Sequence, residues 1–285
     1  MQAGEPPSLL LQIAITLVAL VLVYGVMTLV DMSINSYSSA SKVTATLIPD
    51  TTGDTIIIPQ SIQSGAPLLY PSSNQPTGQE FSFSCFLNIA EDTFATSSAA
   101  RCGTSSTSSG MPSSTVLKHI FSKGTANSFP LMAPGVFCRA DKNTLRIYMN
   151  TNTQWNNFVE VDNIPIKKWF HLVIILPGTY LDVYINGNAV NRIKFAGAVA
   201  KINFGPVFVL NNRHFPDSSS TSQPDFIVDG AAKAMISRLE YFAYALNGSQ
   251  IHGLFQQGPS STVTGTTTSQ LVPYQADNWP LGQSA

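Results

Sequence analysis

Residues 169–187 read Trp-Phe-His-Leu-Val-Ile-Ile-Leu-Pro-Gly-Thr-Tyr-Leu-Asp-Val-Tyr-Ile-Asn-Gly, and this stretch decides the fold. The apolar runs before and after Pro177-Gly178 have the length of β-strands and are rich in β-branched and aromatic residues. Asn186-Gly187 ends the second run. An Asn-Gly pair favours a two-residue hairpin turn, because both central residues need a positive φ. The stretch therefore predicts antiparallel strands, with Trp169 and the apolar residues alternating after it in the core.

Similar runs recur along the chain at intervals of roughly ten residues, separated by turn residues. In residues 80–89, Phe81, Phe83 and Cys85 alternate with hydroxyl residues, which is typical of a strand with one buried face. Further strand-like runs are 43–48, 55–58, 116–121, 135–139, 145–149, 158–161, 204–210 and 234–244. This pattern predicts an all-β sandwich or jelly roll. One short helix is expected after Asn247, with that residue as N-cap and Gln250 three residues on.

Several motifs stand in a distinctive order. Residues 119–124 (His-Ile-Phe-Ser-Lys-Gly) precede Trp169-Phe-His-Leu-Val, which is followed by Val183-Tyr-Ile-Asn-Gly and finally by Ser237-Arg-Leu-Glu-Tyr-Phe. In this order the chain resembles the laminin-G-like branch of the concanavalin A-like lectin/glucanase superfamily, over about residues 50–257. The resemblance implies a jelly-roll sandwich of two antiparallel sheets. It implies little about chemistry, because the matching residues support folding.

The N-terminal region is apolar and has the length of a membrane span. Pro6 to Val30 contains no charged residue. Leu9 to Val30, at about 1.5 Å per residue, forms about 33 Å of helix, which exceeds the bilayer core of about 30 Å. No Lys or Arg precedes position 42, so the basic region of a signal peptide is missing. We therefore expect a transmembrane helix over residues 8–31, preceding the sandwich, rather than a helix buried in a protein assembly.

The domain plan follows from these features and from composition. Residues 1–7 form a short N-terminal segment, and residues 32–42 a Ser-rich stalk. The sandwich is expected over 43–257, with a low-complexity loop at 96–115. A tail rich in Ser and Thr follows at 258–285.

The charge, cysteine and histidine content argues against three other classes of protein: nucleic-acid-binding, disulfide-rich and zinc-binding proteins. The net charge of −1 and a charged fraction of 11% leave no field that attracts nucleic acid. Three cysteines are too few for a dense disulfide framework. Cys85 and Cys102 can pair across the 96–115 loop, and the alternative is that they stay buried free thiols. The four histidines are scattered without the spacing of a zinc site.

The family resemblance also suggests where to look for an active site. Glucanases of the superfamily have a strand with Glu-x-Asp-x-x-Glu, in which one carboxylate attacks and another protonates the leaving oxygen. Glu160-Val161-Asp162 matches the first half of that motif, but position 165 is Pro. We therefore expect no enzyme activity and no catalytic residue.

Two polar segments are candidates for glycan binding, since sugars bind to an aromatic face beside amide hydrogen-bonding groups. The first is Trp155 with Asn152 and Asn156, and the second is the run 211–214. The full set of candidates is Trp155, Asn152, Asn156, Asn211, Asn212, Arg213 and His214. Each segment is equally typical of a turn.

Calcium is the one cofactor that the resemblance suggests, because some laminin-G-like domains hold a calcium ion with loop oxygens. Hard cations need clustered carboxylates and carbonyls. The candidates are Asp92, Asp141, Asp217 and Asp225, each of which is also a common turn residue.

Together these features predict a membrane-anchored, non-catalytic β-sandwich that acts as a structural or tethering protein. The chain is similar to anchored laminin-G-like proteins of large double-stranded DNA viruses. That similarity implies a minor capsid or membrane-associated virion protein in the internal membrane, with other capsid or surface proteins as partners. The alternative is a carbohydrate-binding lectin or adhesin on a cell or virion surface. No nucleic-acid partner is expected.

Overall fold

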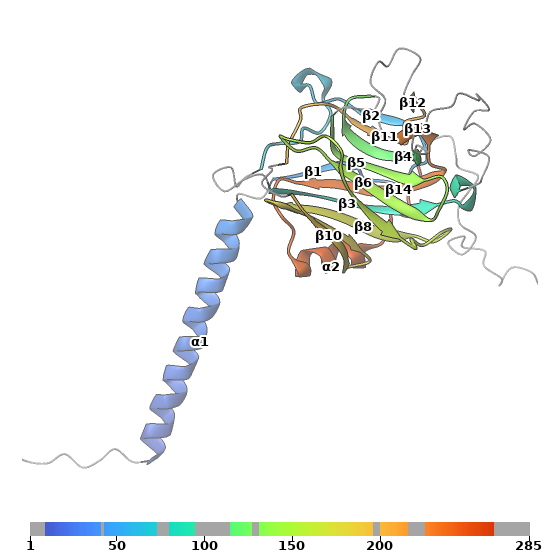
Figure 1. Ribbon diagram of the computed structural model, residues 1–285. Helices are drawn as coiled ribbons and strands as arrows, with labels where there is room; N and C mark the ends of the chain where they lie inside the picture. Colours follow the sequence, from blue (N-terminus) through green and yellow to red (C-terminus); the bar gives the residue numbers. More distant parts are fainter. Residues whose placement is uncertain are drawn as a thin grey trace, which may run out of the picture. The chain divides into compact units, whose positions relative to one another are not determined.

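The computed structural model describes residues 9–40, 43–72, 80–94, 115–126, 131–195, 200–215 and 226–264. The chain divides into two units, Met1–Lys42 and Val43–Ala285. The first contains helix α1, and the second is a β-sandwich with one short α-helix among its described residues (Figure 1).

Helix α1 runs from Leu9 to Ala40. Its segment Leu11–Val30 has a mean hydropathy of 2.6, and none of it is buried. The hydroxyl of Thr16 donates to the carbonyl of Gln12, and that of Thr28 to the carbonyl of Gly25, so both are satisfied within the helix. The segment is long and apolar enough to cross a bilayer, and an N-terminal signal sequence has the same character. The helix also extends through most of the predicted stalk, because no Pro or Gly interrupts residues 32–40.

The first sheet has six strands in the order β1-β14-β3-β8-β9-β10. Their bounds are β1 Thr44–Ile48, β3 Glu80–Ile89, β8 Phe170–Pro177, β9 Tyr180–Ile185, β10 Asn188–Lys194 and β14 Ala234–Phe242. All pairs in this sheet are antiparallel.

The second sheet has eight strands, six of them in the order β12-β13-β4-β5-β6-β7. Their bounds are β4 Thr115–Gly124, β5 Met132–Arg139, β6 Thr144–Met149, β7 Asn157–Asp162, β12 His214–Phe215 and β13 Phe226–Ala231. The remaining two are β11 (Val207–Val209), which pairs with β4, and β2 (Ile56–Ile58), which pairs with β11. The pairing of β13 with β4 is parallel, and the other pairs are antiparallel. The predicted all-β sandwich is thus confirmed, with one parallel pair that the sequence did not reveal.

The main core lies between the two sheets. Phe81, Phe83, Cys85 and Leu87 face it from β3, as their alternation predicts. The Phe83 ring lies 5.9 Å from that of Phe121, which belongs to the other sheet. Burial of these apolar faces is the main stabilising contribution to the sandwich.

The prediction for Trp169 is wrong. Trp169 is only partly buried and precedes β8, whose residues Phe170, Leu172 and Ile174 point into the main core. The alternating residues on the side of Trp169 pack in a separate cluster, which joins Val173 with Ile251 of helix α2 (Gly248–Gln257). Both faces of this strand are apolar, so periodicity did not show which face meets the other sheet.

The strand-like runs of the sequence did not include β10, which only the Asn186-Gly187 turn implied, nor β12 and β13. The residues of β10 are mostly exposed and polar, so they lack the apolar alternation of a half-buried strand. Its hairpin with β9 is nevertheless the predicted one. Asn186 and Gly187 have φ values of 51° and 82°, as the two-residue turn requires.

Strand β4 also extends three residues beyond its expected end at Phe121. Ser122-Lys123-Gly124 resembles a turn, but β11 pairs with this segment and Val207 lies opposite Lys123. The contact is tight, since a Cβ atom on Gly205 would lie 2.4 Å from the Gly124 carbonyl oxygen. A long-range pairing therefore overrides the local turn signal.

The short helix α2 (Gly248–Gln257) has the predicted capping box. The side-chain oxygen of Asn247 accepts from the Gln250 N–H at 2.9 Å, and the Asn247 N–H donates to the Gln250 side chain at 3.0 Å. Ile251 on its inner face is buried against the first sheet.

We expect Asn247→Ala to lower the free energy of unfolding by about 1 kcal/mol, because the first turn loses a cap. Urea unfolding of the full chain in detergent micelles measures the change. Gln256→Ala, in the exposed last turn, is the control and should change stability by less than about 0.5 kcal/mol. Equal losses in the two variants would contradict a capping role.

Candidate functional site

The glucanase-like carboxylates lie on β7 and are held by cations. One oxygen of Glu160 accepts from Arg146 Nε at 2.9 Å, Arg146 Nη2 at 2.7 Å and Arg139 Nη1 at 3.1 Å. Asp162 accepts from the Thr144 hydroxyl at 2.5 Å and from Lys142 Nζ at 3.1 Å.

These contacts keep both carboxylates ionised. Burial raises the pKa of Glu160, but hydrogen bonds from Arg146 and Arg139 and their charges outweigh it, so the pKa lies below its ordinary value. Hydrogen bonds from Thr144 and Lys142 lower the pKa of Asp162. A general acid needs a raised pKa instead, so this pair does not have the character of a glycosidase acid.

The first of the two segments predicted to bind a glycan packs against strand β13 of the second sheet. Trp155 is partly buried, and its ring centroid lies 5.9 Å from that of Phe226. Its carbonyl accepts from the side-chain amide of the buried Asn150 at 2.7 Å. Asn152 is exposed and Asn156 is partly buried.

The second segment precedes and begins β12. Asn211 is buried, and its amide donates to the Ala126 carbonyl at 2.7 Å. Asn212, Arg213 and His214 are exposed, and Nδ1 of His214 lies 2.9 Å from an oxygen of Asp229. The next residue, Phe215, also packs on Phe226, so the structure brings the two segments to one aromatic cluster. Whether they bind a sugar stays a prediction.

The calcium candidates are not gathered among the described residues. Asp92 pairs with Lys233 at 2.6 Å, and Asp141 pairs with Arg139 at 2.5 Å. Asp217 and Asp225 lie outside the described residues. Within the described ranges, no group of three or more His, Cys, Asp or Glu side chains has the arrangement of a metal site.

The cysteines that the structure describes, Cys85 and Cys138, are free thiols in the main core. Burial raises the pKa of both thiols, which makes them unreactive. Cys102 lies outside the described residues, so its pairing with Cys85 stays a prediction.

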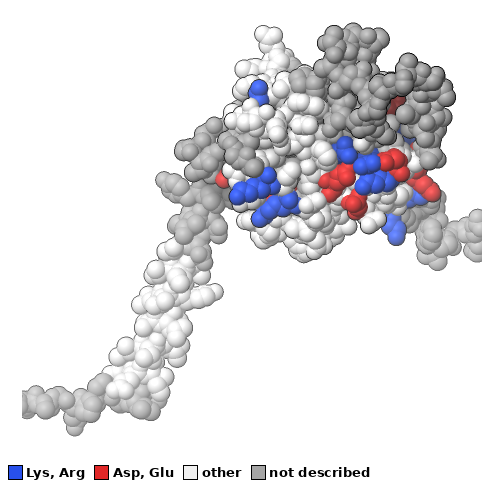
Figure 2. All heavy atoms as spheres, viewed as in Figure 1, with Lys and Arg blue, Asp and Glu red and all other residues white. Residues whose placement is uncertain are grey.

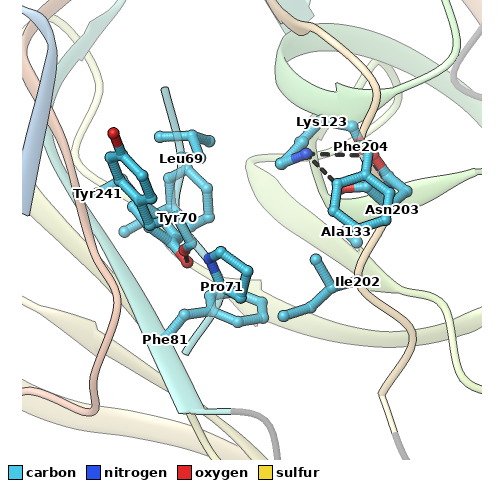
Figure 3. Close-up of a pocket in the computed structure, with 11 residues that line it drawn as sticks. Leu69, Tyr70, Pro71, Phe81, Lys123, Ala133, Ile202, Asn203, Phe204 and Tyr241 are labelled. Atoms are coloured by element: carbon cyan, nitrogen blue, oxygen red, sulfur yellow. Dashed lines mark hydrogen bonds between the residues drawn. The ribbon is translucent and has the colours of Figure 1, made fainter. Parts of the chain in front are cut away.

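A cavity of about 320 Å³ opens between the two sheets. Strands β3 and β14 line it from the first sheet, and β4 and β5 from the second. Loop residues complete the wall (Figure 3). The lining residues are Leu69, Tyr70, Pro71, Phe81, Phe83, Lys123, Ala133, Ile202, Asn203, Phe204 and Tyr241.

Lys123 is the cation of this cavity and was not among the predicted site residues. It is 5% exposed, and its ammonium donates to the Asn203 carbonyl and, at 3.1 Å, to the Gly205 carbonyl. Burial lowers the pKa of Lys123 to about 8. A signal was present in the sequence: Lys123 stands two residues after the buried Phe121, so both side chains fall on the same face of β4.

Comparison with known families agrees with this architecture. Residues 63–252 match the family model described as the concanavalin A-like lectin/glucanases superfamily. The chain belongs to this superfamily. The match lies within residues 50–257, where the motifs suggested it. As a superfamily member, the protein has a lectin-like sandwich, and membership alone assigns it no reaction.

Solved structures similar to this superfamily member include binding domains of botulinum neurotoxins. The serotype D binding domain has a TM-score of 0.44 and 14% identity, covering 76% of this chain and 42% of that one. The serotype D domain in complex with N-acetylneuraminic acid has a TM-score of 0.44 and 15% identity, covering 76% of this chain and 42% of that one. The serotype DC domain in complex with rat synaptotagmin II has a TM-score of 0.41 and 17% identity, covering 76% of this chain and 43% of that one. The chain thus spans less than half the length of these structures, and no curated protein sequence matches it.

Proposed function

We propose that this protein is a single-pass, membrane-anchored, non-catalytic tethering protein. Its lectin-like sandwich presents a binding surface, and helix α1 holds it in a lipid bilayer. The observation behind this proposal is the apolar segment Leu11–Val30, none of which is buried. An exposed apolar helix of this length is stable in a bilayer and costly in water.

The ion pairs of Glu160 and Asp162 support the proposal that the protein is not a glycosidase, because they leave neither carboxylate as a proton donor.

The distribution of charge supports a tethering protein rather than a nucleic-acid-binding protein. Figure 2 shows a mixed cluster of acidic and basic side chains on the visible face, with most of the other described surface uncharged. Such a surface suits docking against protein partners.

The finer assignment within this proposal is a minor capsid or membrane-associated protein in the virion of a large DNA virus. It rests on the similarity to anchored laminin-G-like virion proteins and on the low charge of the chain. The chain would then copurify at fixed stoichiometry with detergent-washed particles, bound to capsid or surface proteins. Its absence from such particles would reject the virion assignment and leave the membrane tether intact.

Membrane fractionation tests the anchor. We expect the full chain to stay in the membrane pellet after an alkaline carbonate wash, with residues 8–31 present in its intact mass. Replacing Leu20 and Val21 with arginine should release it, because each arginine at the centre of a span costs about 3 kcal/mol. The matched control places the two arginines at Ser38 and Ser39, beyond the apolar segment, and should stay in the pellet.

Recovery of the unaltered chain in the wash would reject the anchor. A mature mass lacking residues 8–31 would identify the segment as a cleaved signal sequence and would also reject it.

The second candidate function is a surface lectin or adhesin, which membership in a superfamily containing lectins favours. The exposed Asn212, Arg213 and His214, with Asn152 of the neighbouring segment, would supply the polar contacts to the sugar. A glycan array of the full chain, with and without calcium, tests both the sugar and the cation. Binding to no glycan in either condition would reject this candidate.

A further inference from the structure

The cavity between the sheets has aromatic walls. Phe81, Phe83 and Tyr241 line it from the first sheet. The Tyr241 hydroxyl donates to the Tyr70 carbonyl at 2.7 Å, so this group is already satisfied within the wall. Tyr70 and Phe204 also line the cavity, and they are 55% and 85% exposed. Rings that are both part of the wall and open to solvent are suited to contact an entering ligand.

Lys123 places a positive charge beside these rings. In Figure 3 its amine lies next to Asn203 and Phe204, and Tyr70 and Tyr241 lie across the cavity. Its three hydrogen-bond acceptors are uncharged: the carbonyls of Asn203 and Gly205 and the side-chain oxygen of Asn203. Among the described residues, no carboxylate forms an ion pair with this ammonium. A buried charge without a counter-ion favours binding of an anion.

One of these hydrogen bonds can be exchanged for a ligand. The contact from Lys123 Nζ to the Asn203 side-chain oxygen is long, at 3.4 Å. That oxygen also accepts from the Gly205 N–H at 3.0 Å, so it keeps a partner when the ammonium turns toward a ligand. The Asn203 side-chain amide donates to the Lys123 carbonyl at 3.0 Å, which holds the loop in place during the exchange.

We propose that this cavity binds a small aromatic carboxylate, with its ring between the aromatic walls and its carboxylate on the ammonium of Lys123. The volume of about 320 Å³ is at the lower end of ligand sites, which limits the occupant to a small molecule. One ammonium matches a monoanion better than a phosphate dianion, which needs more donors. This inference is independent of the proposed tethering function.

Calorimetric titration of the full chain in detergent micelles tests the proposal. The probes are 2-naphthoate and its neutral counterpart 2-naphthamide, with the heat from empty micelles subtracted. We expect the unaltered chain to bind 2-naphthoate at least about tenfold more tightly than 2-naphthamide, because only the carboxylate pairs with Lys123. Equal binding of the two probes, or no binding of either, would overturn the proposal.

Three variants locate the site. Lys123→Met should abolish the preference for 2-naphthoate, and Lys201→Met, on the same loop as Asn203 but exposed, should retain it. Phe204→Ala should weaken both probes several-fold by the same factor, since it removes a wall and no charge. The highly exposed Phe204 can be replaced without risk to folding, so this variant decides the location even where Lys123→Met does not fold. Unchanged binding in Phe204→Ala would place the probes elsewhere and reject the site.

Discussion

Phe121→Ala is expected to lower the free energy of unfolding of the sandwich by about 3–5 kcal/mol, the range for deleting a buried phenylalanine ring. Phe121 is 1% exposed and belongs to the main core. Its ring centroid lies 5.9 Å from that of Phe83 on the other sheet, so the substitution opens a void where the sheets meet. Close-packed interiors relax only partly around such a void.

The matched control for this prediction is Phe204→Ala, the same substitution at a residue that is 85% exposed. It should change stability by less than about 0.5 kcal/mol. Urea unfolding of both variants, followed by tryptophan fluorescence, measures the difference. If Phe121→Ala cost no more than Phe204→Ala, the contact between the two sheets at Phe121 would be incorrect.

Glu160→Gln is expected to lower the free energy of unfolding by about 2–3 kcal/mol. Removing one partner of a fully buried ion pair costs about 3–5 kcal/mol, and the partial exposure of Glu160 reduces that cost. The loss arises at Arg146, whose side chain is 7% exposed and whose guanidinium lies 4.3 Å from the centre of the Phe158 ring. Without the Glu160 charge this buried guanidinium lacks its counter-ion.

The pH dependence of this effect has a definite sign. The pKa of Glu160 in the folded protein lies below its ordinary value of 4.5. The ionised carboxylate therefore stabilises the fold fully above pH 4.5, and this stabilisation is lost as the pH falls through the lower pKa of the folded state. The stability difference between the unaltered chain and Glu160→Gln should narrow in acid.

Asp162→Asn is the matched control from the same Glu-x-Asp pair. Its carboxylate is largely exposed, so we expect little change in stability. A catalytic pair would behave differently, because both substitutions would abolish a hydrolytic activity and leave stability nearly unchanged. Comparison of the two unfolding curves with a glycoside hydrolysis assay separates these outcomes.

The sequence alone was sufficient where the signal is local. Asn186-Gly187 predicted its hairpin because the turn depends on the φ angles of those two residues. Asn247 and Gln250 predicted the capping box because both partners lie within one helical turn. The all-β class and the apolar N-terminal helix followed from strand periodicity and from the length of an uncharged run.

Tertiary structure alone decided which faces and which distant residues meet. Both faces of β8 are apolar, so only the packing of the other sheet shows that Phe170, rather than Trp169, enters the core. Lys123 lies in a strand because β5 and β11, the latter from a remote part of the chain, pair with this end of β4, and it lines the cavity together with residues from both sheets. Local patterns depend on neighbouring dihedral angles and burial periodicity, whereas the cavity and the ion pairs depend on strand register between residues far apart in the chain.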